Sequence, residues 1–111
     1  MGEYVFWYVF VKSEKDKETV EEMLKNSYGG WLDETQYENL YEMRGIPNKL
    51  HKLTFIEYFK EEFVAYPTKD VVYIIGVPEY GGRLYVIVVE CGSIIDVREI
   101  TFMEIIRKFY E

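Results

Sequence analysis

The sequence predicts an α+β fold built on a roughly four-stranded mixed or antiparallel sheet. Val71–Ile100 has the pattern of three apolar strands joined by two glycine-containing turns, which is typical of a meander. A β-branched and aromatic segment at Glu3–Lys12 supplies a further strand. The remaining apolar residues recur at helical spacing, so we expect helices packed mainly on one face of this sheet. Residues 1–111 then form a single α+β domain.

The first strand and the first helix follow each other directly. Glu3–Lys12 is apolar on both faces, which favours an interior position in the sheet. Ser13 is a good N-cap, and Asp16 stands where a capping box commonly has Glu or Gln. Gly29-Gly30 predicts the end of this helix.

The pattern from Asp33 to Arg44 predicts a second, short helix. Gln36 occupies the capping-box position, and Leu32 and Tyr37 are placed for a hydrophobic staple. Gly45 follows the last helical position, as expected of a helix C-terminus.

A third helix is expected to begin at the capping box Thr54–Glu57 and to end before Pro67. Its last part, Phe63–Tyr66, is equally compatible with a short strand, and periodicity alone does not separate the two.

The strands of the meander differ in their polarity. Val71–Val77 and Leu84–Glu90 are apolar on both faces and are expected at the centre of the sheet. Ile94–Ile100 alternates apolar and charged residues, which indicates an edge strand. The capping box Thr101–Glu104 then predicts a C-terminal helix through Tyr110.

The bulk composition favours a soluble intracellular protein, with the cytoplasm as the expected compartment. The formal net charge of −7 repels nucleic acids and anionic membranes. The longest apolar run, Tyr4–Val11, is far shorter than the roughly 20 residues that a membrane-spanning helix requires. The segment also lacks the features of a secretory signal.

Residue usage carries information about origin. The chain has one Ala (Ala65), one Gln (Gln36) and one His (His51), whereas Lys, Glu, Tyr, Ile and Val are abundant. Enrichment in Lys and Glu with few amides is a tendency of hyperthermophiles. In composition and size the chain resembles the small proteins of viruses that infect hyperthermophilic archaea. That resemblance implies a thermostable protein with a role in host takeover or packaging, and it names the host cytoplasm as a compartment.

No motif predicts catalysis, a cofactor or a metal site. Cys91 is the only cysteine and His51 the only histidine, so they are the only possible thiol–imidazole pair, and they fall in different predicted elements. Asp70, Glu90 and the triplet Asp96-Val97-Arg98 form only a distorted version of a metal-dependent nuclease pattern, with Arg where Lys is expected. A small nuclease is therefore the third-ranked function, and we name no catalytic residue.

The segment from Arg44 to Lys52 is the one basic island in this acidic chain. Together with two residues of the later turn it supplies the candidate binding residues: Arg44, Lys49, His51, Lys52, Tyr80 and Arg83. Such residues could bind nucleic acid, with a tyrosine stacking on a base. They could also neutralise acids on neighbouring helices or on a second subunit, and the net charge favours this second role.

The aromatic content indicates a surface that a partner covers. Eleven Tyr, seven Phe and two Trp, with strands apolar on both faces, exceed what a few short helices can bury. We therefore expect a homodimer, since twofold dimers are the commonest oligomers. The leading function is a non-enzymatic interaction protein whose acidic surface engages a protein partner. The alternative is a nucleic-acid-binding module that uses segment 44–52.

Overall fold

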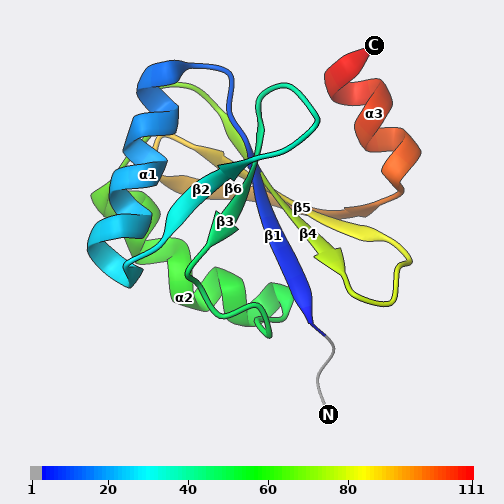
Figure 1. The fold of residues 1–111 in the computed structure, drawn as a ribbon, viewed down its shortest axis with the longest axis horizontal. Helices are drawn as coiled ribbons and strands as arrows, with labels where there is room; N and C mark the ends of the chain where they lie inside the picture. The colour runs from blue at the N-terminus through cyan, green and yellow to red at the C-terminus, as the bar shows by residue number, and fades with distance from the viewer. Residues whose placement is uncertain (1–3) are drawn as a thin grey trace.

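A computed structural model describes residues 4–111, which form one antiparallel sheet of six strands and three helices (Figure 1). In chain order the elements are β1 (Val5–Phe10), α1 (Glu14–Tyr28), β2 (Trp31–Glu34), β3 (Leu40–Arg44), α2 (Lys52–Ala65), β4 (Val72–Pro78), β5 (Leu84–Glu90), β6 (Ser93–Ile100) and α3 (Phe102–Tyr110). The strand order across the sheet is β2-β3-β1-β4-β5-β6.

The expected four-stranded sheet is wrong, because the segment expected to be the second helix is a hairpin. Residues 31–34 and 40–44 pair as β2 and β3, with Leu32 opposite Met43, and β3 pairs in turn with β1. The local capping signals at Asp33 and Gln36 favour a helix, but the long-range pairing with β1 stabilises two strands instead. Without β3, strand β1 would lie at an exposed edge of the sheet although it is apolar on both faces.

The loop of this hairpin is stabilised by its own polar groups. The Thr35 hydroxyl accepts a hydrogen bond from the Tyr37 backbone N–H at 3.1 Å and lies 2.8 Å from the Leu40 carbonyl oxygen. Asn39 has φ 64°, a left-handed conformation that Asn tolerates better than most residues. These contacts reverse the chain within five residues and set the register of β2 against β3.

The other predicted elements agree more closely with the structure. Ser13 caps α1 and Gly29 closes it, and the full capping box of Thr101 and Glu104 starts α3. The meander is present as β4, β5 and β6, with β6 at the edge of the sheet. Helix α2 continues to Ala65, so Phe63–Tyr66 is largely helical and forms no strand; the helix begins at Lys52, with His51 rather than Thr54 as its N-cap.

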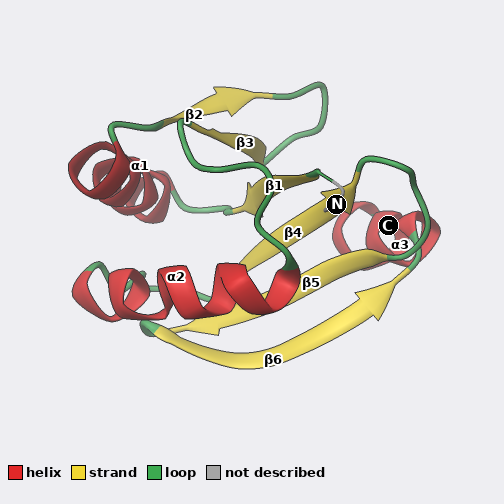
Figure 2. Ribbon diagram, turned by 90° about the horizontal axis from the view of Figure 1, so that it is seen from below, coloured by secondary structure: helices red, strands yellow, loops and turns green. Residues whose placement is uncertain are grey.

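Helices α1 and α2 cover one face of the sheet and bury the larger core (Figure 2). Trp7 stacks on Phe55 with ring centroids 4.0 Å apart, and Phe55 stacks on Phe59 at 4.2 Å. The indole ring of Trp7 also lies over Gly76 on the neighbouring strand. A Cβ atom at position 76 would approach the ring to 2.6 Å, so this strand position requires glycine.

The opposite face of the sheet carries only α3, a helix of nine residues (Figure 2). Side chains of β1, β4 and β5 that alternate with those of the larger core point to this side: Tyr8, Phe10, Tyr73, Ile75, Val77, Leu84, Val86 and Val88. One short helix therefore lies on a broad apolar sheet surface, and this imbalance determines where the candidate site lies.

Candidate functional site

Helix α3 is held on the sheet by side chains along its length. Phe109 stacks on Phe10 at 4.2 Å between ring centroids, and Ile105 is the buried residue of the helix. The Tyr110 hydroxyl donates a hydrogen bond to the Glu38 carbonyl at 2.8 Å. In the N-terminal half of the helix, the Phe102 ring lies 6.4 Å from that of Tyr37 in the β2–β3 loop.

An apolar groove of about 340 Å³ lies between this N-terminal half, the sheet and the β2–β3 loop. Its lining residues are Tyr8, Thr35, Gln36, Tyr37, Leu40, Ile75, Val77, Leu84, Phe102 and Ile105. At its rim Phe102 is 50% exposed, and Met103 next to it in the chain is 56% exposed. We call the groove together with Phe102 and Met103 the α3 face. Grooves of this size and polarity are the usual form of a binding site.

The ionisable groups near the groove are suited to binding and poorly suited to proton transfer. Burial raises the pKa of the Tyr8 phenol, and the neighbouring Glu42 carboxylate raises it further. The pKa of Tyr110 is raised by burial and then by Glu38. Both phenols thus stay protonated at neutral pH and can donate hydrogen bonds, whereas a general base would need a pKa near 7.

Sequence reasoning anticipated that apolar surface would be left over, but it placed no residue of this groove in a site. The signal in the sequence was that β4 and β5 are apolar on both faces, so that apolar side chains point to both sides of the sheet. The position of the groove depends on the β2–β3 loop, which the sequence predicted as part of a helix.

The structure brings most of the predicted basic residues together at one end of the sheet. In an antiparallel sheet the start of β1, the end of β4, the start of β5 and the end of β6 share one end. Segment 48–52 runs along this end, where the Val5 N–H donates to the Asn48 carbonyl at 2.7 Å. We call the residues Lys49, His51, Lys52 and Arg83 the basic end.

Two neighbouring residues of the sheet organise these side chains. The Lys52 ammonium lies 3.7 Å from the Glu99 carboxylate and 5.4 Å from the centre of the Tyr85 ring. Arg83 donates a hydrogen bond to the Glu99 carbonyl at 2.7 Å, and His51 packs edge-on against Tyr85 at 5.8 Å. Residues from two distant parts of the sequence, 51–52 and 83, thus meet around the cross-strand neighbours Tyr85 and Glu99.

Lys49 and Tyr80 complete this end of the molecule. The Lys49 ammonium lies 5.2 Å from the centre of the Tyr4 ring. Tyr80, in the β4–β5 turn, is 80% exposed and projects into solvent. The two sites are linked through the backbone, because Glu79, which precedes Tyr80, donates its N–H to the carbonyl of Tyr4 at 2.8 Å.

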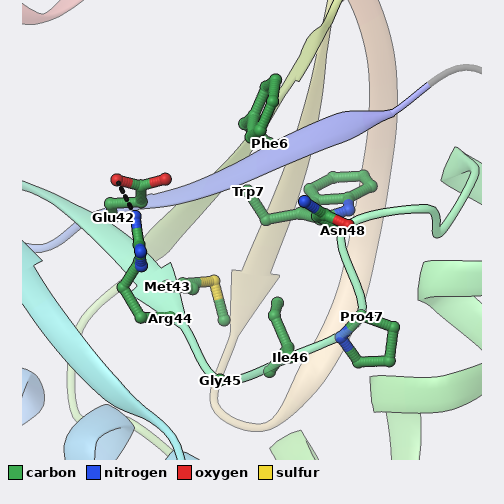
Figure 3. A pocket seen from close by; sticks show the side chains of 9 residues that line it. All are labelled: Phe6, Trp7, Glu42, Met43, Arg44, Gly45, Ile46, Pro47 and Asn48. Carbon is green, nitrogen blue, oxygen red and sulfur yellow. Dashed lines mark hydrogen bonds and ion pairs between the residues drawn. The ribbon is translucent and has the colours of Figure 1, made fainter.

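Arg44 lies apart from the basic end and lines a different pocket (Figure 3). This hollow of about 400 Å³ is formed by Phe6, Trp7, Glu42, Met43, Arg44, Gly45, Ile46, Pro47 and Asn48. The Arg44 guanidinium lies 3.4 Å from the Glu42 carboxylate and 3.9 Å from that of Asp33. Two carboxylates therefore neutralise this arginine, which separates it in function from the other candidates.

The arrangements considered for catalysis are not assembled. His51 packs near the start of β5, whereas the exposed Cys91 follows the end of the same strand, so the two do not form a pair. The Asp96 carboxylate is engaged by Arg98 and by the Val97 N–H. Within residues 4–111 no group of three His, Cys, Asp or Glu side chains is arranged to hold a metal ion.

The edge strand β6 is poorly suited to pairing with another chain. The Asp96 side chain occupies the N–H of Val97 at 2.9 Å, and Arg83 occupies the carbonyl of Glu99. A register shift between Val88 and Val89 also bends the ladder next to this edge. Bulges and charges of this kind protect sheet edges from strand addition.

No protein-family model, curated protein or solved structure matches this chain. In the part that the structure describes, no helix has the length and apolar character needed to cross a membrane.

Proposed function

We propose that this protein is a non-enzymatic interaction protein that forms a homodimer through the α3 face. The observation that carries the proposal is the apolar groove of about 340 Å³, with the half-exposed Phe102 in its lining and the half-exposed Met103 next to Phe102 in the chain. A large exposed apolar patch on a small chain is typical of an interface.

The shape of the α3 face favours a second copy of the same chain. A twofold interface needs a self-complementary patch, because the same residues meet on both sides. Here Phe102 lines the hollow, and the exposed Met103 follows it in the same helix. Met103 of one protomer would pack on the groove of its partner, and the reverse contact would form at the same time.

The local charge also favours self-association at this place. Helix α3 together with Glu111, the residue that follows it, carries two acids, Glu104 and Glu111, and two bases, Arg107 and Lys108. The helix therefore adds no net charge to an interface between two copies of a chain with charge −7. The occupied backbone groups of β6 disfavour the alternative route through the sheet edge.

Dimerisation through α3 would leave α1 on the outside of the assembly, since α1 covers the opposite face of the sheet. The sequence of α1 holds five acidic and three basic residues, and all of these acids except the buried Asp16 are at least partly exposed. We propose that this acidic surface engages a basic protein partner, as complementary potentials steer association.

Light scattering coupled to size exclusion, across a dilution series, tests the dimer. We expect the wild type to be dimeric at high concentration and Met103→Glu to be monomeric, because the new charge would be buried in the interface. Leu53→Glu is the matched control, since Leu53 is an exposed apolar residue on α2, 64% accessible. Circular dichroism verifies that each variant is folded. A monomeric wild type, or a Met103→Glu protein that stays dimeric, would contradict the proposal.

A further inference from the structure

The cations of the basic end are positioned but largely not neutralised. Lys49 and Arg83 have no carboxylate within 4.0 Å among residues 4–111, whereas Arg44, Lys60 and Arg98 are each paired with an acid. Lys49 lies over a tyrosine ring and Arg83 binds a backbone carbonyl, and neither contact involves a carboxylate.

The surroundings strengthen the positive potential at this end. Residues 44–56 and 80–89 contain no acid, and both stretches contribute to the basic end. Two acids among residues 4–111 have contacts at this end: Glu99 pairs with Lys52, and Glu79 accepts from the Tyr4 N–H at 3.4 Å. Helix α2 begins here without an acid in its first turn, so its dipole adds to the same potential.

An exposed aromatic ring lies beside these cations. Tyr80 precedes Gly81 and Gly82, whose φ angles of 80° and 93° form a turn that side chains with a Cβ rarely allow. The turn holds the Tyr80 ring away from the sheet with its faces open to solvent. Cations interleaved with an accessible aromatic ring are the features that bind single-stranded nucleic acids, because phosphates meet the charges and an unstacked base meets the ring.

We infer that the basic end is a binding site for single-stranded nucleic acid, independent of the α3 face. Lys49, Lys52 and Arg83 contact successive phosphates, and Tyr80 stacks on a base. A duplex suits the site less well, since its bases are already stacked and cannot cover the ring. Three phosphate contacts, without hydrogen bonds to base edges, would give weak binding with little sequence preference.

Fluorescence anisotropy with a labelled oligothymidine tests the inference. Three neutralised phosphates predict a slope of about −2 for log K against log salt, so affinity should fall about 20-fold between ~50 and ~200 mM salt. Lys49→Gln should weaken binding and make the slope shallower by about 0.7. Tyr80→Ala should weaken binding about fivefold or more and leave the slope unchanged.

Lys25→Gln on α1 is the matched control, because it removes one positive charge far from the basic end and should leave the affinity nearly unchanged. Two results would overturn the inference: no binding of the oligonucleotide at low salt, or an equal loss in Lys25→Gln and Lys49→Gln. Tighter binding of a duplex than of the single strand, with Tyr80→Ala unaffected, would also overturn it. Since each substituted side chain is on the surface, circular dichroism should show unchanged folding.

Discussion

The most heavily buried carboxylate of the described chain, Asp16, joins the first turn of α1 to the segment before β4. It is 1% exposed, and its two oxygens accept the backbone N–H groups of Lys69 at 2.6 Å and Asp70 at 2.9 Å. The Ser13 hydroxyl caps the helix by accepting a hydrogen bond from the Asp16 N–H. The Asp16 side chain, however, turns away from the cap toward this segment. The shorter acid at the capping-box position thus has a tertiary role.

Replacing Asp16 should destabilise the fold more than replacing any exposed acid of α1. Asp16→Ala leaves two N–H groups without their partner, which we expect to cost about 2–3 kcal/mol of unfolding free energy. Asp16→Asn, with one acceptor oxygen, should fall between it and the wild type. Urea denaturation measures the effect, with the exposed Glu18→Ala as the control. A loss below about 0.5 kcal/mol for Asp16→Ala would show that water replaces the carboxylate.

A partly buried phenol, that of Tyr28, predicts how stability depends on alkaline pH. Burial raises the pKa of Tyr28 to about 12, with further contributions from Glu62 and Tyr58, whereas its ordinary value is 10.0. Between these two values the unfolded chain has lost the proton that the folded chain keeps. The free energy of unfolding should therefore be unaffected below pH 10 and should fall as the pH rises toward 12.

Tyr28→Phe should reduce this fall, because the side chain no longer titrates. Urea midpoints at two pH values, one below 10 and one just below 12, measure the difference between wild type and variant. Part of the fall should remain, since the pKa values of Tyr8 and Tyr110 are raised in the same direction. Tyr80→Phe, at an exposed position, is the control. An equal alkaline loss in Tyr28→Phe and wild type would refute this assignment.

At the scale of elements, the sequence predicted those whose ends are set by adjacent residues. Ser13, Gly29 and the Thr101–Glu104 box each act within one helical turn, so their meaning does not depend on distant contacts. The N-cap of α2 lies three residues before the expected Thr54, because His51 caps the helix through its Nδ1 atom at 3.4 Å from the Leu53 nitrogen. Histidine is not among the usual capping residues.

The β2–β3 hairpin could not be predicted for a physical reason. Its sequence fits a helix start as well as it fits two short strands, and the choice depends on β1, which lies more than twenty residues upstream. One further signal for a hairpin was present, because Leu32 and Met43 are apolar residues that lie opposite each other when the two strands pair. Such short segments carry too little period-2 signal to outweigh a capping pattern.

The turn between β5 and β6 offers a test of local turn chemistry. Cys91 and Gly92 both have positive φ, 49° and 84°, as in a two-residue hairpin turn of type I′. Asparagine is the preferred residue at the first of these positions. We expect Cys91→Asn to stabilise the protein by about 0.5–1 kcal/mol and Cys91→Val to destabilise it. Calorimetry measures both, and an asparagine variant no more stable than the valine variant would exclude strain at this turn.

At the scale of the whole molecule, the sheet is covered unevenly. Two helices of 15 and 14 residues lie on one face and a helix of nine on the other. The sequence indicated the surplus of apolar surface, because it shows directly that the central strands are apolar on both faces. It could not indicate the groove, because the groove arises where α3 and the β2–β3 loop meet. The basic residues were visible in the sequence, yet only the sheet shows that Arg83 joins them and Arg44 does not.

The net charge of −7 and the two proposed surfaces lead to opposite responses to salt. Two protomers whose centres approach to about the shortest dimension of the molecule, 26 Å, repel each other by about 8 kcal/mol without screening. The Debye length is about 30 Å at 0.01 M salt and about 10 Å at 0.1 M. Raising the salt between these values should therefore remove about 2–3 kcal/mol of repulsion and tighten the dimer about 50-fold.

Sedimentation equilibrium at these two salt concentrations measures the dimer constant, while binding of the oligothymidine is followed in the same buffers. The apolar α3 face should associate more tightly as salt rises, and the basic end should release its ligand. Met103→Glu should abolish the first response and keep the second, whereas Lys49→Gln should keep the first and make the second weaker and less steep. A dimer that weakens with salt would mean that charge pairs, and not the apolar groove, hold the protomers together.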